Sequence, residues 1–141
     1  MNDVIIKIKG TQTYDKDSDV TEFETQGKIE ILKDLIRLSY DESEMIGASG
    51  VKTELTLFDG KRMELVRKGA MAGILTVEKG RRHTCLYNTP YGDFMVGVYG
   101  EAVDVGLDEK GGKIYLRYTL DVNSGMLSRN LLEIDIKNLN S

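Results

Sequence analysis

The sequence of 141 residues contains no tryptophan and only one cysteine (Cys85), one histidine (His83) and one proline (Pro90). A single cysteine excludes an intramolecular disulfide, and one cysteine with one histidine cannot supply the ligands of a zinc site. No run approaches the ~20 apolar residues of a membrane-spanning helix. The N-terminal segment carries Asp3 where a secretory signal would be basic. We therefore expect a cytoplasmic protein with no membrane segment, no metal and no cofactor.

An excess of positive charge is also absent. The chain has 19 basic and 23 acidic residues, and its formal net charge is −4. This balance argues against a nucleic-acid-binding protein that neutralises phosphates. The charge is uneven, because residues 61–82 carry seven basic and two acidic side chains. This basic segment could face an anionic ligand or a partner, but we favour a solvated surface paired with acidic neighbours, because long charged runs are usually solvated.

What the sequence has in abundance is alternation of apolar and polar residues, the pattern of half-buried antiparallel strands. The clearest case is residues 113–122, KIYLRYTLDV, where the apolar residues occupy every even position. Similar alternation is found in residues 4–9, 22–31, 36–40 and 132–137. No segment has a sustained apolar stripe with a period of 3.6 residues. The sequence therefore predicts an all-β protein.

Glycine-containing turns separate the predicted strands. The sequence LFDGKR resembles a two-residue Asp-Gly hairpin, but pairing Phe58 with Lys61 would place core residues opposite charges. One more loop residue brings the apolar side chains of 55–57 and 63–65 onto one face, so we predict a three-residue loop with a glycine bulge. The apolar positions change from even to odd at Gly100. This change predicts a bulge or a sharp bend there.

About ten strands, mostly joined by short turns, predict a meander in one domain that spans residues 1–141. A flat sheet of this size would expose its apolar face, whereas a barrel buries that face and removes both edges. We therefore expect a closed antiparallel barrel of about 8–10 strands. A two-sheet sandwich satisfies the same alternation and is the structural alternative. Residues 14–19, YDKDSD, are predicted to form an acidic, mobile loop.

Several short sequences in a fixed order carry a family resemblance. They are SYDESE (39–44), GVKTEL (50–55), Arg67 with Gly69, EKG (78–80) and TPYG (89–92). In this order they resemble the YwiB-like family of small bacterial proteins, described as calycin-like β-barrels of unknown function. The resemblance extends from about Val4 to Ile136. It implies a lipocalin-like barrel shape and a bacterial cytoplasmic setting, but no catalytic residue. The Gly-x-Trp of true lipocalins is missing, so ligand carriage does not follow from this analogy.

The candidates for catalysis are weak. If residues 82–88 form a strand, His83 and Cys85 lie on the same face roughly 6.5–7 Å apart, too far for a reliable hydrogen bond. We interpret Cys85 as a buried hydrophobic residue and His83 as a surface or rim residue. The carboxylates of DESE (41–44) could bind a cation, but an acidic turn needs no function. We expect no catalytic residue, and we interpret NTPYG (88–92) as a turn.

The strongest candidate for ligand binding is Arg67. It shares the parity of Met63 and Leu65, so its side chain should point toward the barrel interior or its rim. A guanidinium there could bind a carboxylate or phosphate in bidentate fashion, or could be a structural partner of protein groups. Four further polar residues are predicted to face the same way and to assist it: Tyr40, Tyr118, Thr25 and Thr53.

The sequence thus predicts a non-enzymatic binding module that holds a small apolar or amphipathic ligand in its barrel, with an anionic group as one option for Arg67. The alternative is a structural or interaction protein without a ligand cavity. Its outer face, for instance the basic segment 61–82, would dock a partner or a second copy in a homodimer. A large apolar patch on the surface would favour this alternative.

Overall fold

A computed structural model describes residues 2–14, 16–41, 52–68, 73–89, 92–108, 110–122 and 125–139. All regular structure in these segments is β-strand, and no helix that could cross a membrane occurs in them. The all-β class and the number of strands are therefore confirmed. The strands are β1 (Asn2–Tyr14), β2 (Asp17–Leu32), β3 (Leu35–Asp41), β4 (Lys52–Phe58), β5 (Arg62–Lys68), β6 (Gly73–Glu78), β7 (Arg82–Thr89), β8 (Gly92–Asp108), β9 (Gly111–Val122) and β10 (Gly125–Asn138).

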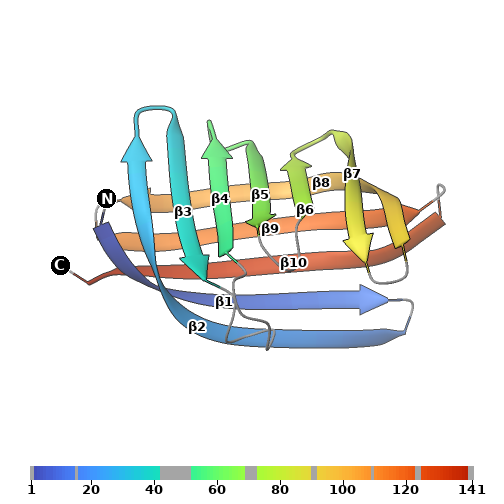
Figure 1. Ribbon diagram of the computed structural model, residues 1–141, viewed down its shortest axis with the longest axis horizontal. Coiled ribbons are helices and arrows are strands. Elements are labelled where there is room, and N and C mark those ends of the chain that lie inside the picture. The colour runs from blue at the N-terminus through green and yellow to red at the C-terminus, as the bar shows by residue number, and fades with distance from the viewer. Residues whose placement is uncertain are drawn as a thin grey trace.

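The strands form a closed barrel. Each strand pairs antiparallel with the next along the chain, and β1 also pairs with β10, so that the ladder has no end. In Figure 1 the long strands β1, β8, β9 and β10 run side by side along the long axis, and the shorter strands β3 to β7 cross them steeply. Strand β2 starts beside β1 and curves into the layer of short strands (Figure 1). The continuous ladder confirms the barrel over the sandwich alternative.

The predicted alternation places one apolar face in the core. Leu38, Leu55, Met63, Leu116 and Ile134 are each at most 1% exposed. All ten strands contribute to a single cluster of buried apolar residues. Burial of one large aliphatic side chain contributes about 1.5–3 kcal/mol, so this cluster is the main source of stability. Because side chains fill the middle of the barrel, a ligand site is best sought at its ends or on its outer face.

The predicted three-residue hairpin is confirmed. Phe58 pairs with Arg62, which leaves residues 59–61 as the loop. Asp59 and Gly60 have φ angles of 52° and 67°, in the left-handed region that glycine adopts without strain. The apolar residues of β4 consequently face those of β5 on the inner side of the barrel.

The bulge predicted at Gly100 is also confirmed. The register between β8 and β9 shifts between Gly100 and Ala102. The turn between β6 and β7 packs against this point, and the Gly80 N–H donates a hydrogen bond to the Gly100 carbonyl oxygen at 2.9 Å. A Cβ atom on Gly100 would collide with the backbone carbonyl of Glu78. The first half of β8 pairs with β7, and the second half pairs with β9. The bulge therefore lies where the pairing with β7 ends.

The acidic loop predicted over residues 14–19 is wrong. Strand β1 ends at Tyr14, β2 starts at Asp17, and these two residues pair with each other. Ser18 and Asp19 are exposed strand residues. Aspartate and serine are poor strand formers, but the ladder with β1 overrides this preference where the side chains point into solvent.

Candidate functional site

Strand register brings three of the five predicted ligand-binding residues together at one end of the barrel. Tyr40 of β3 pairs with Thr53 of β4, and Thr53 pairs with Arg67 of β5. Residues directly opposite on one face of an antiparallel pair have Cβ atoms about 4.5–5.5 Å apart. Tyr40, Thr53 and Arg67 thus form one row on the inward face of the sheet.

The other two predicted residues lie outside this row. Thr25 is near it, because Gly27, two residues further along β2, pairs with Tyr40. The Thr25 hydroxyl donates a hydrogen bond to the Gln26 carbonyl oxygen at 3.4 Å. Tyr118 lies in β9, pairs with Gly100 and Asn130, and packs against the core. It belongs to the layer of long strands, so the register does not unite it with Arg67.

Within the row, Thr53 combines burial with an unused hydrogen-bonding group. Thr53 is 1% exposed and Tyr40 7% exposed, while Arg67 is half-buried. The Thr53 hydroxyl oxygen has no hydrogen-bond partner among the described residues. A buried polar group in this state costs about 1–3 kcal/mol. The Tyr40 ring lies against that of Phe23, with centroids 6.2 Å apart.

A groove of about 320 Å³ opens beside this row. Its positive side chains outnumber its carboxylates. One of those carboxylates, Glu54, lies 3.4 Å from the Arg37 guanidinium, which offsets its charge. Lys52 stands between Asp41 and Lys68 in the strand register, and Arg67 adjoins Thr53. The groove is lined by Lys28, Ser39, Tyr40, Asp41, Lys52, Thr53, Glu54 and Lys68. It is a locally positive site in an acidic protein.

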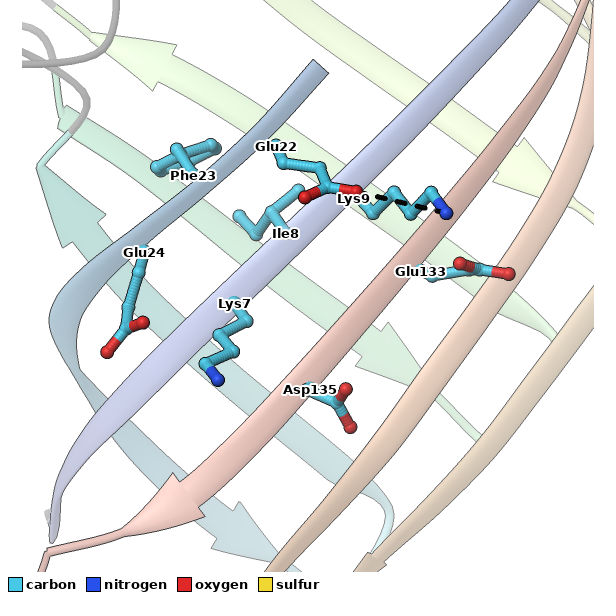
Figure 2. Close-up of a pocket in the computed structure, with 8 residues that line it drawn as sticks. All are labelled: Lys7, Ile8, Lys9, Glu22, Phe23, Glu24, Glu133 and Asp135. Atoms are coloured by element: carbon cyan, nitrogen blue, oxygen red, sulfur yellow. Dashed lines mark ion pairs between the residues drawn. The ribbon is translucent and has the colours of Figure 1, made fainter. Parts of the chain in front are cut away.

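A larger groove, of about 440 Å³, lies over β1 on the outside of the barrel. Figure 2 shows its charged side chains on three neighbouring strands, with the lysines of β1 between the carboxylates of β2 and β10. Lys7 stands between Glu24 and Asp135 in the register, and the Lys9 ammonium lies 3.8 Å from the Glu22 carboxylate. Exposed pairs of this kind contribute little energy. Because its lysines already have carboxylate neighbours, we do not assign a ligand to this groove.

His83 and Cys85 do not form a nucleophile pair. Cys85 is buried, and its Sγ accepts a hydrogen bond from the backbone N–H of Thr76 at 3.4 Å. The His83 Nε2 lies 2.8 Å from the Glu78 Oε1. This hydrogen bond to His83, assisted by the charge of Arg81, lowers the pKa of Glu78 below its ordinary value. The interpretation of Cys85 as a buried residue is confirmed, whereas the sequence did not reveal Glu78 as the partner of His83.

The carboxylates of the DESE segment remain a prediction. Of residues 41–44, only Asp41 lies within the described part of the chain. In that part, no three His, Cys, Asp or Glu residues are grouped so that they could hold a metal ion.

Sequence reasoning missed a polar cluster inside the layer of long strands. The Ser128 hydroxyl accepts hydrogen bonds from the Gln12 side-chain amide at 3.3 Å and from that of Asn130 at 3.0 Å. Ser128 and Asn130 are buried. Their signal in the sequence is their parity with Leu132, which places both on the inward face. Since these groups satisfy one another, we interpret the cluster as structural.

The lysines of the groove were missed for another reason. Lys28, Lys52 and Lys68 lie on three different strands, and the alternation assigns each of them to the outward, solvated face. Only the strand register and the curvature of the sheet bring them to one end of the barrel. No signal within the sequence of a single strand could have identified them.

Two comparisons with known proteins yield matches. The profile of a family described as "Domain of unknown function (DUF1934)" matches residues 6–134. Among solved structures, the chain is similar to the ywiB protein from Bacillus subtilis, with a TM-score of 0.84 and 21% identity over 97% of this chain and 92% of that one. A likeness at this identity is one of fold. No curated protein matches the sequence significantly.

Proposed function

This chain belongs to the family described as a domain of unknown function (DUF1934), and from this premise we propose that it is a non-enzymatic binding module for a small amphipathic anion. The proposed site is the groove at the barrel end where Tyr40, Thr53 and Arg67 form a row. This placement refines the expectation of a ligand in the barrel, because the middle of the barrel is filled by the core. The family resemblance drawn from the sequence is confirmed.

The observation that carries the proposal is the Thr53 hydroxyl. Thr53 lines the groove, and its hydroxyl oxygen is buried and has no hydrogen-bond partner among the described residues. Stable proteins rarely leave such a group unsatisfied, and the exceptions call for an explanation such as a bound group. A ligand oxygen that accepts a hydrogen bond from this hydroxyl would remove the penalty.

The charges around Thr53 support an anionic head group. A carboxylate or phosphate can accept charge-assisted hydrogen bonds from Lys52 and Lys68, which line the groove. Arg67 lies on the inward face of β5 and is not one of the lining residues. An apolar tail would lie against Tyr40, the aromatic residue that lines the groove. The ligand class is therefore an amphipath with one anionic end.

Calorimetric titration with octyl phosphate, octanoate and uncharged octanol tests the proposal. We expect the two anions to bind, and Thr53→Val or Lys52→Gln to weaken the binding of octyl phosphate roughly 5- to 10-fold. The control is Lys113→Gln, which removes a lysine that is 82% exposed on β9 and should leave the affinity unchanged. Equal binding of octanol, or no effect of Thr53→Val, would overturn the proposal. Native mass spectrometry of protein purified from its own host would identify the ligand.

The alternative function, docking through the outer face, is favoured by a separate observation. Strands β6, β7 and β8 each carry an apolar side chain that is about half exposed, namely Ile74, Leu86 and Met95. These residues lie on strands other than those of Tyr40 and Thr53.

A further inference from the structure

An apolar row crosses four neighbouring strands on the outside of the barrel. Val66 of β5 pairs with Ile74 of β6, and Leu86 of β7 pairs with Met95 of β8. The register of β6 with β7 places Ile74 beside Leu86. Each of the four strands therefore contributes one outward apolar side chain to the same line. We call these four residues the apolar row.

The apolar row is accessible to solvent. Ile74, Leu86 and Met95 are 55%, 47% and 59% exposed, and Val66 is half-buried. The adjacent line on the same face runs from Glu64 through Thr76 and Thr84 to Gly97, which the guanidinium of the Arg82–Asp121 ion pair covers. Contiguous exposed apolar surface rimmed by polar residues marks interaction sites in soluble proteins. The outer face over β1 and β10, with its alternating lysines and carboxylates, is entirely different.

We propose that this face mediates homodimerisation, with the apolar row of one copy packed on the same row of a second copy about a twofold axis that runs along the row. The charges on β5 indicate a second copy as the occupant. Glu64 and Lys68 lie on the same outward face, two residues to either side of Val66. Neither has an ion partner within the part of the chain that the structure describes.

The twofold axis makes these charges complementary. It reverses the direction of β5 in the second copy, so that Val66 packs against Val66 of the other copy. Glu64 of each copy then lies opposite Lys68 of the other, and the ion pair occurs twice. A surface whose charges are complementary to themselves across a twofold axis fits an isologous dimer.

The area of the face determines how tightly we expect two copies to associate. Four strands about 4.8 Å apart, with about six residues of 3.3 Å each, give roughly 400 Å² in projection. The accessible area of a side-chain surface is larger than its projection, but it remains near the lower limit for specific interfaces, at about 600 Å² per partner. We therefore expect reversible association in the micromolar range.

Sedimentation velocity of the full-length protein, without ligand and over a roughly hundredfold range of concentration, tests the dimer. We expect a concentration-dependent rise from the monomer mass to twice that mass. Leu86→Asp should weaken association at least about 10-fold, because it buries a charge at the interface. The matched control is Val20→Asp, which makes the same kind of change at a 57% exposed residue of β2 and should leave association intact. A monomer at all concentrations, or equal weakening by Val20→Asp, would overturn the proposal.

Charge reversal provides a second test that does not depend on the folding of Leu86→Asp. Glu64→Lys and Lys68→Glu should each weaken association, since each opposes like charges across the axis, and the double variant should restore it. A double variant that stays monomeric would contradict the twofold arrangement. Lys68 also lines the ligand groove, so association is measured without ligand. A failure of the dimer proposal is then distinguishable from a failure of the proposed ligand binding.

Discussion

At the scale of a single residue, Thr53 links stability to binding. Its buried hydroxyl lacks a partner among the described residues, so valine, which has nearly the same shape, removes an unfavourable group. We expect Thr53→Val to raise the free energy of unfolding in urea by about 1 kcal/mol while weakening ligand binding. Thr21→Val, at an exposed position of β2, is the control and should change stability much less. A loss of stability in Thr53→Val would mean that the hydroxyl is satisfied after all.

Odd and even positions along each strand predicted which side chains share a face of the sheet. For this reason the sequence identified the inward-facing residues of the site. The inward direction of Tyr40, Thr53 and Arg67 followed from their even or odd positions among apolar neighbours. The pairing of Glu78 with His83 did not, because it forms across a turn where parity has no meaning. Contacts within one strand are readable from spacing, whereas contacts between strands require the register.

At the scale of the elements, hydrophobic alternation identified strands wherever one face is buried. It predicted the three-residue loop after Phe58 and the bulge at Gly100, because the register of the apolar positions changes at both places. It failed over residues 14–19. There both faces of the β1–β2 ladder are exposed, so apolar and polar residues do not alternate. Strands held by backbone pairing alone leave little trace in the pattern of side chains.

Two glycines of β8 allow a prediction at this scale. Gly100→Ala would push a methyl group against the backbone of Glu78, which cannot move without opening the β6–β7 turn. Gly97→Ala would instead meet the guanidinium of Arg82, an exposed side chain that can move at the cost of its ion pair with Asp121. We expect Gly100→Ala to lower the free energy of unfolding by about 1–3 kcal/mol, as overpacking does, and Gly97→Ala to lower it less. Urea denaturation compares the two, and equal losses would contradict this account of the bulge.

At the scale of the whole molecule, closure of the barrel could be predicted because ten amphipathic strands have no other compact way to bury one face without leaving edges. The crossing of long and short strands in Figure 1 could not, since it depends on where β2 and β8 bend and change partners. The apolar row and the ligand groove are consequences of this arrangement. Both candidate surfaces therefore became visible only in the folded structure.

The dependence of global stability on acid follows from two carboxylates. The pKa of Asp121 is lowered by its hydrogen bonds to Arg82, at 2.6 and 3.0 Å, and that of Glu78 by its hydrogen bond to His83. A carboxyl group whose pKa is lower in the folded than in the unfolded state stabilises the fold above its unfolded pKa, about 3.9 for aspartate and about 4.3 for glutamate. That contribution disappears as the pH falls through the folded pKa.

We therefore expect urea denaturation to show a progressive loss of stability as the pH is lowered below about 4.5. Asp121→Asn and Glu78→Gln should be less stable than the wild type at neutral pH and should approach it in acid, because the wild-type carboxylates are then protonated as well. The bond from Arg82 on β7 to Asp121 on β9 passes over Gly97 of β8, so its loss loosens three strands together. Asp104→Asn, at an exposed position of β8, is the control and should retain the acid dependence of the wild type. The difference in stability between Asp121→Asn and the wild type should therefore depend on pH. If it is the same at neutral and acidic pH, the ionised carboxylate is not the stabilising group.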